Sequence, residues 1–166
     1  MKKVTVTNVK MVGLRSVLKV LAESTLPIKF TLARNLKALE GSYEEYTEEK
    51  NALHKKHVLL NENGEGVIKD EFTELLSQVQ SVPYQWFEYS SEKDSDLFFK
   101  ALEELNTTEV EIGLHSEQLD RKVKVKLGGE ASETIETLTL QEILEDPSSK
   151  VNANALAVLL EYEILK

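Results

Sequence analysis

The stretch NENGEG and the residues after it partly match a calcium-binding loop. Asn61, Asn63 and Glu65 stand at the first, third and fifth positions of a twelve-residue EF-hand loop, and Gly66 stands at its turn glycine. The last position of such a loop needs a bidentate Glu, and here it is Phe72. Two amides and one carboxylate supply little charge for Ca²⁺, whereas Asn and Gly tolerate the positive φ of a tight turn. The stretch is therefore predicted to be a turn.

Two histidines, His54 and His57, have the spacing that can place two metal ligands on one helix face. The residues between them are Lys55 and Lys56, whose charges repel a cation, and no acidic residue has matching spacing. We interpret both as surface histidines. The sequence has no catalytic-triad signature, no nucleotide-binding glycine pattern and no cysteine. It therefore indicates no catalytic residue, no metal ligand and no cofactor, and we interpret the chain as a non-enzyme.

The stretch PYQWFEY gathers four aromatic residues, among them the only Trp of the chain: Tyr84, Trp86, Phe87 and Tyr89. Aromatic residues of this kind dominate the energetics of protein interfaces. The alternative, which the pattern leaves open, is that they cap the protein's own core. If the segment is extended, Trp86 and Phe87 point to opposite sides, so one of them needs a partner from this chain or another. These four residues are the predicted partner-binding site.

The charge of the chain is distributed unevenly. Residues 1–40 contain eight Lys and Arg but only two Glu, although the whole chain has a net charge of −9. A basic end and an acidic body can attract each other within one chain or between copies. The negative total disfavours non-specific nucleic-acid binding. Because the sequence has neither a long apolar run nor a signal-peptide pattern, we expect no membrane partner.

Hydrophobic periodicity indicates the elements that position these residues. Steps of four and three residues predict a helix from about Ile28 to His57. Its apolar stripe is Leu32, Leu36, Leu39, Tyr43, Tyr46, Lys50, Leu53 and His57. Two shorter helices, over residues 70–80 and 94–105, are expected to fold back on it as antiparallel neighbours. The apolar side of the first of these is Phe72, Leu75, Leu76 and Val79.

Alternation of apolar and polar residues predicts strands at residues 3–7, 108–115 and 121–127. The last two alternate carboxylates and lysines, so we expect them to pair antiparallel and to match opposite charges. A short helix, LQEILED, and a last helix starting at Asn152 or Asn154 follow. The buried side of the last helix is predicted to be Leu156, Leu159 and Leu160. The predicted fold is α+β, a single domain over residues 1–166, in which a long antiparallel helical hairpin has a small antiparallel sheet and short helices at one end.

Three stretches of the chain resemble an uncharacterised family of small proteins from phages and prophages of Gram-positive bacteria. They are LPIKFTLARNLKALEGSYEEYTEEKNAL, the turn NENGEG, and ALEELNTTEVEI with the tail NANALAVLLEYEIL. The chain departs from the family over residues 69–92, which are longer than the usual connection and contain the aromatic residues. The family has no assigned chemistry, so the resemblance transfers no catalytic residue. It implies a phage protein in the host bacterial cytoplasm.

These observations favour a non-enzymatic phage protein that acts through protein–protein interaction. The predicted partner is a host protein, such as a defence component, or a phage assembly partner. One alternative is a small metal-dependent hydrolase or nuclease with an unrecognised site. Another is a self-associating structural protein, because the heptad stripe can close within one chain or between two, as a monomer or a homodimer.

Overall fold

The computed structural model describes most of the chain. The described residues are 1–23, 28–117, 120–127, 130–137, 145 and 151–165. They form two compact units, Met1–Tyr43 with Glu109–Lys166 (unit 1) and Glu44–Thr108 (unit 2). The fold is α+β, as predicted, and the long helix α2 spans Lys29–His57. That the chain is a single domain stays a prediction.

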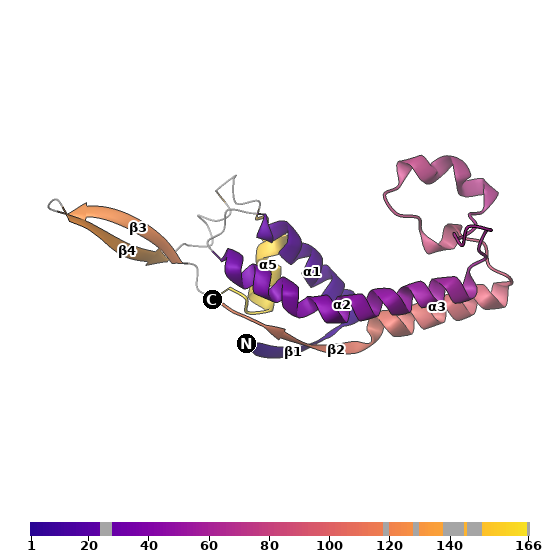
Figure 1. Cartoon of the computed structure of the whole chain (residues 1–166), viewed down its shortest axis with the longest axis horizontal. Helices are drawn as coiled ribbons and strands as arrows, with labels where there is room; N and C mark the ends of the chain where they lie inside the picture. Colours follow the sequence, from indigo (N-terminus) through magenta and orange to yellow (C-terminus); the bar gives the residue numbers. More distant parts are fainter. Residues whose placement is uncertain (24–27, 118–119, 128–129, 138–144, 146–150, 166) are drawn as a thin grey trace. The chain divides into compact units, whose positions relative to one another are not determined.

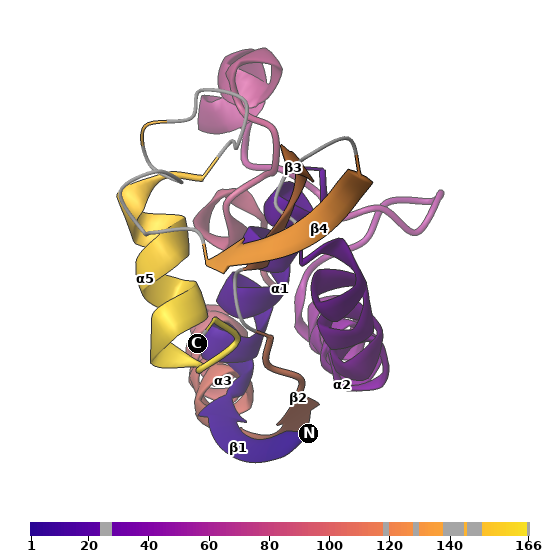
Figure 2. The same ribbon diagram turned by 90° about the vertical axis from the view of Figure 1, so that its left-hand side faces the viewer.

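Unit 1 begins with strand β1 (Lys2–Thr7), as predicted, and continues directly into helix α1 (Asn8–Ala22). β1 pairs antiparallel with β2 (Glu109–Leu114). Figure 2 shows α1 with the last helix, α5 (Ala153–Glu161), on one side and α2 on the other. Leucine, isoleucine and methionine side chains fill the space between these helices. The buried ones are Met11, Leu14, Leu18, Leu21, Ile28, Leu32, Leu39, Leu156, Leu159 and Ile164.

The strand pairing differs from the prediction. β2 pairs with β1, and β3 (Asp120–Leu127) pairs antiparallel with β4 (Glu130–Thr137). The Lys3 ammonium lies 2.6 Å from the Glu111 carboxylate, so this carboxylate of β2 pairs with a lysine of β1. The acidic complement of β3 is in β4, where Glu133 stands opposite Lys124. Alternating charge correctly predicted β2 and β3, but it does not choose between several complementary partners.

The part of α2 in unit 1 buries an amide among its leucines. Leu36, which the stripe predicted to be buried, is only half-buried, whereas Asn35 is fully buried. The Asn35 Nδ2 donates to the His115 carbonyl at 2.9 Å, and its Oδ1 accepts from the His115 N–H at 2.6 Å. One turn earlier, the Thr31 hydroxyl donates to the Glu117 carboxylate. Polar contacts therefore join α2 to the residues that follow β2.

Helix α5 begins where the sequence predicts, because the Asn152 side chain accepts from the Ala155 N–H at 2.8 Å. Leu160, predicted to be buried, is exposed. The predicted helix LQEILED lies largely outside the described residues. Within the ranges given above, no helix is long and apolar enough to cross a membrane.

Unit 2 contains the second half of α2 and helix α3 (Glu92–Thr107), which form the predicted antiparallel hairpin (Figure 1). The Tyr46 hydroxyl donates to Asn106 Oδ1 at 2.9 Å. Toward the other end of the hairpin, the rings of His57 and Phe98 have their centroids 6.3 Å apart. His57 is buried, so its prediction as a surface histidine is wrong. It occupies a stripe position, which faces α3.

Candidate interaction surface

Three short extended segments lie between α2 and α3 in unit 2. The first contains Leu59, the second Val67 and the third Glu88. The Leu59 N–H donates to the Glu88 carbonyl at 2.9 Å, the Glu88 N–H donates to the Val67 carbonyl at 2.8 Å, and the Val67 N–H donates to the Leu59 carbonyl at 2.8 Å. Each segment is therefore bonded to both of the others, in a closed ring of main-chain hydrogen bonds. We call this arrangement the junction, and it fixes the course of the chain between the two helices.

The stretch NENGEG forms the turn between the first two segments of the junction, as predicted. The Asn61 side-chain oxygen accepts from the N–H groups of Asn63 and Glu65, each at 2.9 Å. Gly64 has φ of 78°, a conformation that glycine adopts without steric cost. The oxygen that would be the first calcium ligand is thus bonded to amides of the turn itself.

Gly66 starts the second segment, and the Phe87 ring lies against it. A Cβ at Gly66 would lie 2.6 Å from Phe87 Cε1 and 3.0 Å from His54 Cε1. Phe87 in turn meets the His54 ring edge-on, with centroids 4.8 Å apart and an interplanar angle of 85°. Burial lowers the pKa of His54 from its ordinary value, which favours the neutral imidazole. Phe87 therefore packs against a glycine and the edge of this imidazole ring.

We expect Gly66→Ala to lower the free energy of unfolding by about 1–3 kcal/mol, because the new methyl group overlaps the Phe87 ring. The matched control is Gly41→Ala at an exposed position of α2, where an added Cβ meets nothing within 4 Å. That change should raise the free energy of unfolding by about 1 kcal/mol through helix propensity. Urea denaturation followed by circular dichroism measures both, and a stabilised Gly66→Ala variant would contradict the packing.

Three of the four predicted site residues gather around Phe98 of α3. The ring centroids of Tyr84 and Tyr89 lie 5.1 and 5.6 Å from that of Phe98, which is fully buried. Phe87 joins them through Tyr84, with centroids 6.2 Å apart. The Tyr89 hydroxyl donates to the Tyr84 carbonyl at 2.9 Å, and burial raises the pKa of Tyr89 to about 12. For these three residues, the contacts agree with the alternative interpretation of the sequence, in which the aromatic residues cap the protein's own core.

Trp86 points the other way. Its ring stacks on Phe72, with centroids 5.0 Å apart and an interplanar angle of 4°. Trp86 and Phe87 thus have different partners, as expected for neighbours at the edge of an extended segment. Phe72 was not among the predicted site residues, because the sequence places it 14 positions away, on a helix expected to pack elsewhere.

Residues 70–85 leave the junction and return to it, and we call them the excursion (Figure 1, magenta to pink). Its ends are joined: the Lys69 N–H donates to the Trp86 carbonyl at 2.9 Å, and Lys69 Nζ donates to the Gln85 carbonyl at 3.0 Å. It contains two 3₁₀ helices, η1 (Asp70–Gln78) and η2 (Tyr84–Trp86), the second of which runs into the junction.

The helix η1 has no buried residue, so the prediction that its apolar side packs on the long helix is wrong. The physical reason is its period. The spacing of Phe72, Leu75, Leu76 and Val79 makes one stripe in an α-helix, but a 3₁₀ helix has three residues per turn. Phe72 and Leu75 then share one edge and Leu76 lies on another, while Val79 follows the end of the helix, so no edge is wide enough for a packed layer.

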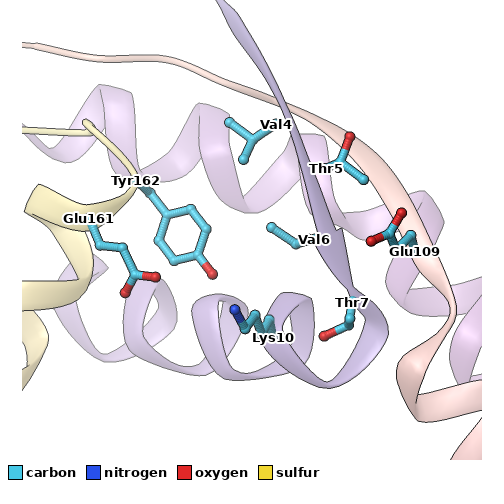
Figure 3. A pocket seen from close by; sticks show the side chains of 8 residues that line it. All are labelled: Val4, Thr5, Val6, Thr7, Lys10, Glu109, Glu161 and Tyr162. Atoms are coloured by element: carbon cyan, nitrogen blue, oxygen red, sulfur yellow. The ribbon is translucent and has the colours of Figure 1, made fainter.

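Unit 1 contains a separate cavity of about 250 Å³. Figure 3 shows Glu161 and Tyr162 at the end of α5, facing β1 and Lys10 of α1. Burial and the nearby Glu161 carboxylate raise the pKa of Tyr162, so its phenol is a hydrogen-bond donor at neutral pH. The full lining is Val4, Thr5, Val6, Thr7, Lys10, Glu109, Glu161 and Tyr162. Because these residues come from distant parts of the chain, no motif pointed to them.

In the part of the chain that the structure describes, no group of three or more His, Cys, Asp and Glu side chains is placed to hold a metal ion. Comparison of the chain with protein-family models, with curated proteins and with solved structures found no match. The resemblance to phage proteins therefore stays a prediction.

Proposed function

We propose that this chain is a non-enzymatic phage protein that acts in the host bacterial cytoplasm by binding another protein through Trp86 and the excursion. The observation that carries the proposal is the stacking of Trp86 on Phe72. Phe72 belongs to helix η1, in which no residue is fully buried. Leu75, one 3₁₀ turn after Phe72, is 38% exposed. Adjacent aromatic and leucine side chains that remain accessible offer apolar area for a partner to cover.

The way the excursion is held supports the same proposal. Compact surface loops with joined ends are frequently functional. The hydrogen bonds of Lys69 to the main chain of Gln85 and Trp86 hold the two ends together before any partner arrives. A preorganised surface loses less conformational entropy on binding than a free loop does. In this proposal Tyr84, Phe87 and Tyr89 fix the junction from the side of α3, and Trp86 is the residue that the partner contacts.

The test is an affinity capture with the full chain from bacterial lysates prepared with and without phage infection. We expect one protein to be retained by the wild type and lost with Trp86→Ala. A host target should appear in both lysates, and an assembly partner only after infection. The matched control is Phe30→Ala, which removes an aromatic ring that is 85% exposed in unit 1.

The captured protein is then purified and titrated with each variant by calorimetry, after circular dichroism has shown that the variants are folded. Trp86→Ala should weaken binding by about thirtyfold or more, the effect of losing an interface hot spot, and Phe30→Ala should not change it. A partner that binds both variants equally, or no Trp86-dependent partner in either lysate, would overturn the proposal.

A further inference from the structure

The helix η1 presents an apolar edge next to an acidic edge. In a 3₁₀ helix, side chains three residues apart eclipse each other along the axis. Phe72 and Leu75 therefore share one edge, and Glu71 and Glu74 share the adjacent edge. Phe72 is half-buried against Trp86, while both glutamates are exposed. The accessible apolar surface is thus bordered along its length by carboxylates.

The charged residues of the stretch that contains this surface are all acidic. Residues 70–92 contain five Asp and Glu and no Lys, Arg or His. The nearest cation before them, Lys69, is directed at the Gln85 carbonyl. Within the described ranges, the ion pairs are Lys2–Glu163 and Lys3–Glu111, and both lie in unit 1. The carboxylates of η1 therefore have no ion-pair partner in the described part of the chain.

The same asymmetry holds for unit 2 as a whole. It contains 15 Asp and Glu against six Lys, a net charge of −9. The rest of the chain contains 14 acidic and 14 basic residues, which cancel. The entire net charge of the protein therefore lies in the unit that bears the excursion. A partner of opposite charge is attracted over several ångströms before contact, and a like-charged one is repelled.

We propose that the excursion binds a cationic amphipathic segment of the partner protein. Apolar side chains of that segment cover Trp86, Phe72 and Leu75, while its Lys or Arg residues face Glu71 and Glu74. The choice of occupant rests on charge complementarity. An acidic segment would bring like charges together along the acidic edge. A purely apolar segment would cover the carboxylates without giving them an opposite charge, which is unfavourable. This inference rests on the proposed function and specifies the chemistry of its partner.

The test titrates the full chain with two synthetic amphipathic helical peptides of about 18 residues, one with Lys and Leu and one with Glu and Leu in the same pattern. Trp86 is the only Trp, so its fluorescence reports directly on the surface. We expect the Lys peptide to shift the emission to shorter wavelength with saturation. Its affinity should fall as salt rises from about 0.05 to 0.5 M, because the charges are exposed. The Glu peptide should cause no shift, and equal binding of the two peptides would overturn the proposal.

A pair of charge reversals locates the site. Glu71→Lys with Glu74→Lys should weaken binding of the Lys peptide by about tenfold or more. The matched control is Glu45→Lys with Glu48→Lys, which has the same spacing and the same charge change at exposed positions of α2 in the same unit. It should change binding by about twofold at most, through the overall field. Equal losses in the two variants would show that only the net charge attracts the peptide, and would overturn the assignment to η1.

The two proposals fail in different ways. If a captured partner requires Trp86 but binds the Glu71→Lys, Glu74→Lys variant as it binds the wild type, the cationic segment is wrong and the proposed function stands. If no captured protein requires Trp86, the proposed function fails, even where the Lys peptide binds.

Discussion

Phe98→Ala is expected to lower the free energy of unfolding by about 3–5 kcal/mol, the typical cost of truncating a fully buried phenylalanine. Phe98 is completely inaccessible, and the rings of Tyr84, Phe99 and Tyr89 surround it with centroids 5.1, 5.3 and 5.6 Å away. The substitution removes the ring against which those side chains pack. It leaves a cavity at the end of the hairpin where the junction begins.

The measurement is urea denaturation followed through the fluorescence of Trp86, which belongs to unit 2. Leu97→Ala is the matched control, since it truncates the preceding residue of the same helix, where the side chain is 45% exposed. We expect that change to cost about 1 kcal/mol or less. If both variants shift the midpoint by the same amount, Phe98 is not the centre of the aromatic packing.

The helices were predictable from the sequence because their signal is local. The stripe from Leu32 to Leu53 repeats within a single segment, so it indicates an α-helix without knowledge of the partner. His57 also falls on this stripe, but the neighbouring lysines led to its prediction as a surface histidine, and that prediction is wrong. Strand pairing was not predictable in the same way. Glu111 pairs with Lys3 of β1, although the lysines of β3 offer the same opposite charge, and the choice depends on the path of the chain between the strands.

The sequence predicted the aromatic stretch of the candidate site but not the residue on which Trp86 stacks. Composition identified the aromatic stretch, and the alternation of an extended segment predicted that Trp86 and Phe87 point to opposite sides. Neither observation identified Phe72, because its stacking on Trp86 depends on the course of the excursion. That course depends in turn on the 3₁₀ period of η1, whereas the apolar spacing over residues 70–80 is typical of an α-helix. Asn35 was missed for another reason: an amide inside a leucine stripe has no periodic signal.

Asn35→Ala is expected to lower the free energy of unfolding by about 2–4 kcal/mol. The Asn35 side chain satisfies both the N–H and the carbonyl of His115, at 2.6 and 2.9 Å, and it is fully buried. Removing it leaves two main-chain groups without those partners, and each unsatisfied group costs about 1–3 kcal/mol when buried. Asn51→Ala, at an exposed position of the same helix, is the control and should change the free energy by less than about 0.5 kcal/mol.

A second variant separates hydrogen bonding from packing. Leucine has the same branched arrangement of side-chain heavy atoms as asparagine and a better helix propensity, so Asn35→Leu fills the space again but makes neither hydrogen bond. We expect it to be almost as destabilised as Asn35→Ala. A Leu variant as stable as the wild type would mean that the site requires only volume.

The same variants show how the two units are coupled. Asn35 belongs to unit 1, and the single Trp to unit 2. Circular dichroism follows the helices of both units, whereas the fluorescence of Trp86 follows unit 2 alone. If Asn35→Ala shifts the two transitions equally, the chain unfolds as the single cooperative domain that the sequence predicts. If only the dichroism transition shifts, helix α2 passes through a boundary between two units that unfold independently, and binding at the excursion will not depend on the packing around Asn35.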